Sequence, residues 1–160
     1  MSVILSAKGI ITPLSSKSHI AYTFNIDKNI DKLNIDFSYY PKKLEDMKKA
    51  KSIIEKSIHE YIEVFGDKFS GSWQNFLPVL NLLTISIDDP YGFRGCSHRH
   101  DHIQHLILSE EETSPGFMKS PIVKGLWKVT ISVHAVVTDT CEYNLCIWEG
   151  DSKDAKNVSM

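Results

Sequence analysis

Apolar and polar residues alternate along most of the chain, and this period of two predicts short β-strands. Residues 18–26 are apolar at every second position, and residues 33–39 repeat the pattern. Strict alternation indicates a strand with one buried face. The same reasoning predicts further strands over residues 3–11, 78–87, 93–97, 103–108 and 127–135 and around residues 143–147.

Residues 41–65 change to the period of an α-helix. Apolar residues recur there at spacings of three and four, while lysines and glutamates occupy the remaining positions. This pattern predicts an amphipathic helix of about six turns. Pro41 suits its first turn, and Gly66 is placed to end it. We expect its apolar stripe to lie on an open face of the sheet.

Seven to eight short strands separated by turns, without a regular strand–helix–strand alternation, are typical of an all-β antiparallel sandwich. We therefore predict a jelly-roll-like sandwich with one inserted amphipathic helix around residues 41–65. A chain of 160 residues suits a single domain, which we place at residues 1–149. Residues 150–160 are small and polar, and we predict a disordered tail there.

The overall charge and the cysteines predict which partners the protein does not bind and in which compartment it lies. A formal net charge of −2 predicts no binding to nucleic acid or to a membrane surface. The first residues lack the regions of a secretory signal, and no stretch approaches the length of a transmembrane helix. Three sparse cysteines are typical of free thiols in a reducing compartment, so we expect a cytoplasmic protein.

Several short motifs occur in order in the second half of the chain. Residues 88–95 read Asp-Asp-Pro-Tyr-Gly-Phe-Arg-Gly, residues 108–117 read Leu-Ser-Glu-Glu-Glu-Thr-Ser-Pro-Gly-Phe, and Ser-Pro-Ile and Gly-Leu-Trp-Lys-Val follow from residues 120 and 125. Together they resemble the N-terminal β-sandwich that precedes the catalytic domain of CehA-like PHP-type metal-dependent phosphoesterases. The resemblance extends over most of residues 5–149.

This resemblance implies a sandwich fold and a supporting role, and it does not imply phosphoesterase activity. In the longer proteins, a catalytic domain that opens with a metal-binding His-x-His motif follows the sandwich, whereas this sequence ends at Met160. We therefore expect a non-catalytic accessory or binding module. Its expected partner is a separately encoded phosphoesterase, or a second copy of the chain in a homodimer.

Arg94 and its neighbours in the first motif predict a braced loop. Gly92 and Gly95 flank Arg94 in a turn that needs a permissive backbone. Arg94 is expected to pair with a carboxylate, either Asp88 or Asp89. It is also a candidate binding residue.

Four histidines within eight residues form the most unusual feature of the sequence. His98, His100, His102 and His105 lie in one loop, and His134 stands on the polar face of the long predicted strand. Neutral imidazoles are good ligands for zinc and other divalent transition metals. A metal-binding protein or metal-dependent hydrolase that uses His98, His100, His102 and His134 is therefore the alternative function. A solvated loop and a pH-sensitive or interface role stay open for the same residues.

We find no complete catalytic set elsewhere in the sequence, and we expect no catalysis and no resident cofactor. Cys96 with His98 or His134 supplies a nucleophile and a base, but the sequence shows no third orienting group. Trp73 and Trp148 are candidate binding residues for a carbohydrate, because sandwich folds often host such sites.

Overall fold

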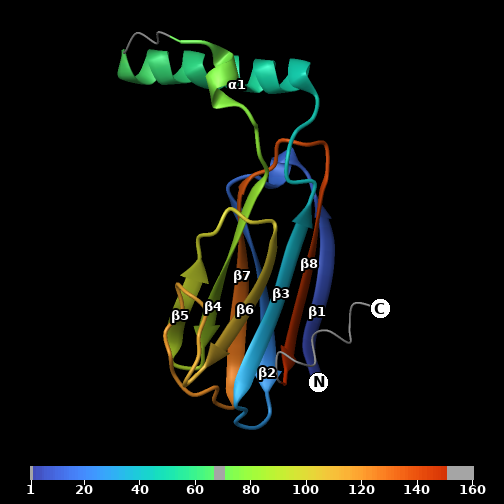
Figure 1. Ribbon diagram of the computed structural model, residues 1–160, viewed down its shortest axis with the longest axis vertical. Helices are drawn as coiled ribbons and strands as arrows, with labels where there is room; N and C mark the ends of the chain where they lie inside the picture. Colours follow the sequence, from blue (N-terminus) through green and yellow to red (C-terminus); the bar gives the residue numbers. More distant parts are fainter. Residues whose placement is uncertain (1, 67–70, 151–160) are drawn as a thin grey trace.

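The computed structural model describes residues 2–66 and 71–150, and eight β-strands make up nearly half of this region (Figure 1). Apart from Gly150, the tail predicted over residues 150–160 lies outside the described residues. No helix in the described ranges is both long and apolar enough to cross a membrane. The elements are β1 (Ser2–Ile11), β2 (Ser18–Ile26), β3 (Lys32–Tyr40), α1 (Met47–Phe65), β4 (Leu82–Asp89), β5 (Gly92–Ser97), β6 (Ile103–Ser109), β7 (Gly125–Ala135) and β8 (Cys141–Glu149), with short 3₁₀ helices η1 (Pro13–Ser15) and η2 (Trp73–Phe76).

The strands form two four-stranded antiparallel sheets. The strand order is β1-β8-β3-β6 in the first sheet and β2-β7-β4-β5 in the second. The chain therefore pairs its first strand with its last, the second with the seventh, the third with the sixth and the fourth with the fifth. This order is the double Greek key of a jelly roll. The predicted all-β antiparallel sandwich is confirmed.

The apolar positions of the strands meet in one core between the sheets. Trp127, Val129 and Ile131 of β7 are fully buried, and they share a cluster with Leu33 and Ile35 of β3 in the other sheet. Burial of one side chain of this kind stabilises the fold by roughly 1.5–3 kcal/mol. Apolar side chains from every strand except β5 enter this core, which holds the two sheets together.

Helix α1 lies beyond one end of the sandwich (Figure 1), so the expectation that it covers an open sheet face is wrong. Asp46 caps its N-terminus by accepting a hydrogen bond from the Lys49 backbone N–H at 3.1 Å. Gly66 ends it in the left-handed conformation, with φ 67°. Ala50 and Ile54 are its buried residues, and they lie on the side that packs near η2.

An extended pair of segments at the base of α1 explains both its position and its first residue. Residues 42–44 run antiparallel to residues 79–81, with two backbone hydrogen bonds of 2.9 Å between them. These backbone groups are used in a strand-like pair, so the helix begins at Met47 instead of Pro41, and β4 begins only at Leu82. We call this pair of segments the stalk, because it holds α1 away from the sandwich.

The side chain of Asn81 joins the stalk to the loop between β7 and β8. Asn81 is fully buried, and its Nδ2 donates to Pro41 O at 2.9 Å and to Thr138 Oγ1 at 2.8 Å. Its Oδ1 accepts a hydrogen bond from the Val137 backbone N–H at 2.7 Å. All three bonds are internal, so the buried amide is satisfied and fixes the direction in which the stalk leaves the sandwich.

Cys141 and Cys146 lie on opposite faces of β8, as their spacing of five residues predicts. Cys141 faces the core, and burial raises the pKa of its thiol to about 11. Cys146 points to the outer face, where partial burial and then the nearby charge of Asp36 raise its pKa. Cys96 is half-buried on β5, and all three cysteines are free thiols.

We expect Cys96 to react with a maleimide faster than the other two thiols at about pH 8, because the thiolate is the reactive species. Cys141 should stay unlabelled, since it is buried and protonated. Peptide mass spectrometry over a time course measures the three rates. An Asp36→Asn variant should speed the labelling of Cys146 and leave Cys141 unchanged. Labelling of Cys141 as fast as Cys96 in native protein would contradict the burial of its thiol.

Candidate functional site

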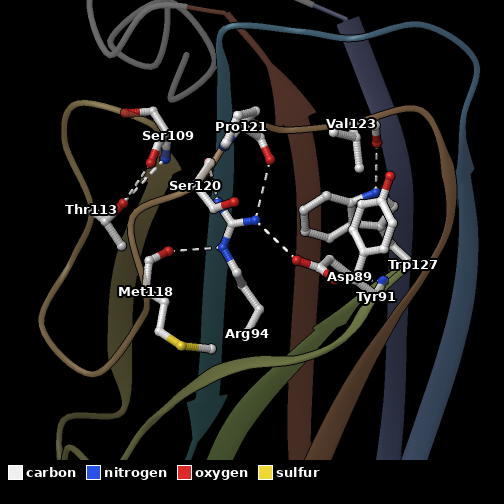
Figure 2. Close-up of polar contacts among 10 residues, drawn as sticks. All are labelled: Asp89, Tyr91, Arg94, Ser109, Thr113, Met118, Ser120, Pro121, Val123 and Trp127. Atoms are coloured by element: carbon white, nitrogen blue, oxygen red, sulfur yellow. Dashed lines mark hydrogen bonds and ion pairs between the residues drawn. The ribbon is translucent and has the colours of Figure 1, made fainter.

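The predicted brace around Arg94 is present, and it lies beneath the loop that joins β6 to β7 (Figure 2). Arg94 is 1% exposed, and its Nη1 donates to Asp89 Oδ2 at 3.0 Å. Its Nε donates to Met118 O at 2.8 Å, and its two terminal nitrogens donate to Pro121 O at 3.2 Å and to Ser120 O. One side chain thus ties the β4–β5 hairpin to the chain that enters β7.

A close backbone approach holds the same loop against β5. Gly95 and Gly116 have φ values of 140° and 95°, in the region that favours glycine. A Cβ atom on Gly95 would lie 2.3 Å from Gly116 O, and one on Gly116 would lie 2.2 Å from Cys96 O. Cys96 N donates to Gly116 O at 3.1 Å, and Met118 N donates to Arg94 O at 2.9 Å. The loop therefore pairs with the outer edge of β5 and covers it.

The geometry makes Arg94 a bracing residue. Its guanidinium carbon lies 5.7 Å from the centroid of the Trp127 ring, and its carboxylate partner Asp89 also accepts a hydrogen bond from Tyr91 N at 2.7 Å. A ligand would have to displace the loop to reach it. The binding role predicted for Arg94 therefore finds no support in the structure.

The two tryptophans predicted as binding residues lie in different surroundings. Trp148 is only 1% exposed, and its Nε1 donates to Asp36 Oδ2 at 2.8 Å. The expectation of an exposed platform is therefore wrong for Trp148, because its ring is covered and lies 6.1 Å from that of His105. Trp73 is half-buried in η2, with Lys51 Nζ 5.8 Å from the centroid of its ring.

The structure does not bring the four predicted metal ligands together. His98, His134 and His102 each contact a different group, and His100 is exposed. Within residues 2–66 and 71–150, no three His, Cys, Asp or Glu side chains form a group that could hold a metal ion. The contacts are His98 Nε2 to Cys96 Sγ at 2.9 Å, His134 Nε2 to Thr84 Oγ1 at 2.8 Å, and the His102 ring to the Tyr39 ring, with centroids 6.2 Å apart.

Cys96 and His98 are the nucleophile and base considered from the sequence, and they are in contact. Their separation of 2.9 Å is suitable for proton transfer. In the described part of the chain, no hydrogen bond joins the other ring nitrogen of His98 to a third, orienting group. The pair lacks this component of a nucleophilic site.

Sequence reasoning missed a polar trough on the outer face of the β1-β8-β3-β6 sheet. Ser6, Cys146, Asp36 and His105 are register partners in one row across its four strands. They line a depression of about 590 Å³ together with residues of the neighbouring row, Lys8, Asn144 and Ser38 among them. The positions were visible as the polar face of each strand, but the register that aligns them was not.

Two of the side chains in this trough, Asp36 and His105, are bonded to each other. Asp36 Oδ1 lies 2.5 Å from His105 Nδ1, so the carboxylate favours the tautomer with a proton on that nitrogen. Cys146 lies across β3 from His105, and among the described residues no hydrogen bond joins Cys146 Sγ to the imidazole. The row therefore contains no nucleophile and base in contact.

A second depression, almost entirely apolar, lies along α1. We call it the arm groove, and we call α1 with η2 the helical arm. The groove has a volume of about 580 Å³. Because α1 stands on the stalk beyond the end of the sandwich, the sheets do not cover this face (Figure 1). The residues that line the groove are Ile53, Ile54, Ser57, Ile58, Tyr61, Phe76 and Val79.

Large apolar side chains remain exposed around the arm groove. Val64 is 75% exposed and Phe65 is 63% exposed, and Met47 at the other end of α1 is 50% exposed. Phe76 of η2 is 49% exposed. Exposed apolar side chains beside an apolar groove are typical of an interaction surface.

The fold and these surfaces define a jelly-roll β-sandwich that carries a helical arm. The chain matches the family of unknown function DUF6669 over residues 2–152, and it therefore belongs to that family. No curated protein matches the chain. The resemblance to the accessory domain of CehA-like phosphoesterases is not tested by the family match and stays a prediction.

We expect an Arg94→Met variant to lose about 3–5 kcal/mol of the free energy of unfolding, since it leaves Asp89 and several loop carbonyls without their donor. Arg94→Lys should recover only part of the loss, because an ammonium group cannot reproduce the planar fork. Urea unfolding followed by tryptophan fluorescence measures both values.

Lys128→Met is the matched control for the Arg94 variants. Lys128 Nζ lies 3.7 Å from Asp88 Oδ2 on the same part of the sheet, but this pair is substantially exposed to solvent. Its removal should cost no more than about 1 kcal/mol. Equal losses for Arg94→Met and Lys128→Met would contradict the brace.

Proposed function

We propose that this protein is a non-catalytic binding module that acts by binding another protein chain through its helical arm. The observation that carries the proposal is the arm groove together with the exposed apolar side chains around it. A chain that needed α1 only for its own stability would gain more by packing the apolar stripe on a sheet. Instead, the stalk presents this stripe away from the core.

The composition of the groove favours a protein partner. Its lining is aliphatic and aromatic, with Ser57 as the one hydroxyl-bearing side chain apart from Tyr61. Protein interfaces place such residues at the centre and charged residues at the rim. The charged face of α1, with Lys56 and Glu63 exposed on it, supplies a rim of this kind.

The non-catalytic part of the proposal rests on the two pairs that resemble catalytic groups. Cys96 and His98 are in contact on the β5 side but have no third group in the described residues. Asp36 and His105 are paired in the trough, and in the described part of the chain no hydrogen bond joins His105 to Cys146 on the other side of β3. Neither pair combines a nucleophile, a base and an orienting group.

The partner and the location stay predictions. The sequence resemblance suggests a separately encoded phosphoesterase as partner, and three free thiols favour a cytoplasmic protein. A metal-dependent role for the histidine loop also stays a prediction, and the positions of His98, His100, His102 and His134 add no support to it.

Photo-crosslinking from the arm in cells that produce the protein tests this proposal. A benzophenone amino acid placed at Val64, on the exposed apolar stripe, should give one covalent adduct of defined mass. The same probe at His59, on the charged face of α1, is the matched control and should give little adduct. Mass spectrometry then identifies the second chain in the adduct.

Absence of an adduct at Val64, or equal adducts from both positions, would overturn the proposed function. A circular dichroism spectrum of each labelled protein establishes that α1 is still folded. An adduct with a second copy of the chain and an adduct with another protein both support a binding role, and the masses separate these outcomes.

A further inference from the structure

The charges of α1 are separated along its length. Residues 47–54 contain Lys48, Lys49 and Lys51 and no acidic residue, which gives a charge of +3. Residues 55–65 contain three glutamates and one lysine, which gives a charge of −2. The N-terminal half of the helix is therefore basic, and the C-terminal half is acidic.

This arrangement opposes the dipole of the helix itself. A helix is stabilised by acidic residues near its N-terminus and basic residues near its C-terminus. Helix α1 has no acidic residue in its first turn and no basic residue in its last turn. The helix dipole therefore does not account for the charge pattern. Two of the charges also have partners within the chain, because Lys51 Nζ lies 3.9 Å from Glu55 Oε1 and Lys49 Nζ lies 2.8 Å from Asp139 Oδ1.

The charged residues also border both edges of the apolar stripe. At 100° per residue, Lys49 and Glu60 fall beside one edge of the stripe, and Lys51 and Glu55 fall beside the other. Each edge thus carries a basic residue toward the N-terminus and an acidic residue toward the C-terminus. A partner that fits this surface must be apolar at its centre, with the opposite order of charge at its rim.

We propose that the partner is a second copy of this chain, bound with the two α1 helices antiparallel across a two-fold axis. This inference rests on the proposed function and names the occupant of the arm groove. In an isologous interface, a residue at one end of the patch meets a residue at the other end in the partner copy, and the reciprocal contact also forms. Antiparallel helices set the basic half of each copy against the acidic half of the other, whereas parallel helices would set like charges together.

The position and size of α1 fit such a pair. A helix of 19 residues is about 28 Å long, and it projects beyond the end of the sandwich (Figure 1). Ser57 lines the groove near the middle of α1, and its small side chain allows the helix axes to approach closely. Val64 and Phe65 of one copy would then cover apolar surface near Met47 and Ile53 of the other.

A charge-swap experiment tests this arrangement on the purified full chain. The acidic variant carries Lys49→Glu and Lys51→Glu, and the basic variant carries Glu55→Lys and Glu60→Lys. Each variant presents one sign of charge at all four rim positions, so each should self-associate about tenfold more weakly than the native protein. Their equimolar mixture should form a heterodimer, because the rims are complementary again. Sedimentation velocity at low and high salt measures the association.

Two further variants separate the interface from the fold. Val64→Asp should abolish association, whereas His59→Asp on the opposite face of α1 should leave it unchanged. The acidic variant should keep its helix, because it adds negative charge to the N-terminal half. Circular dichroism and thermal unfolding check that all these proteins are folded.

If the native protein is a monomer, the second-copy inference is overturned. The crosslink from Val64 in cells then decides whether the helical arm binds a different protein, as the proposed function requires. A dimer that is insensitive to the charge swap, with no gain on mixing, overturns the antiparallel arrangement. A dimer weakened in each variant and restored in the mixture supports it.

Discussion

The fold depends on the burial, between two sheets, of apolar side chains from seven of the eight strands, all except β5. Trp127 and its neighbours on β7 are fully buried because the strands of the opposite sheet cover them. The pairing of first strand with last and second with seventh means that this core closes only when both ends of the chain are in place. Contacts that are distant in the sequence therefore determine the position of every surface feature.

The Arg94 brace is one consequence of this long-range closure. Its carboxylate partner Asp89 lies close in sequence, whereas the carbonyl acceptors Met118, Ser120 and Pro121 lie more than twenty residues later. The buried charge is tolerated because its donors have acceptors within the chain. The result is a loop fixed over the edge of β5, which leaves that edge unavailable for pairing with another strand.

Unlike the Arg94 brace, the helical arm lies away from the core of the sandwich. The stalk and the buried amide of Asn81 hold α1 beyond the sandwich, so most of its apolar stripe gains nothing from the sheets. The outer sheet face near Asp36 and His105 is instead lined by polar side chains, and its carboxylate already binds His105 and Trp148. Of these two surfaces, the arm is therefore the better candidate for binding another protein, and its charge pattern is complementary to a second copy of itself.

The sequence by itself determined the sandwich, because the period of two along each strand encodes which side chains face the core. The pairing of Arg94 with a nearby carboxylate was predictable for a similar reason, since both residues lie in one hairpin. The start of α1 was less predictable, because residues 42–44 pair with a segment about forty residues away and so delay the helix to Met47. Only the tertiary structure decided that Trp148 is covered, that the histidines disperse and that Asp36 meets His105. Each of these depends on strand register and on the direction of the stalk, which arise from contacts between distant segments that local sequence patterns do not record.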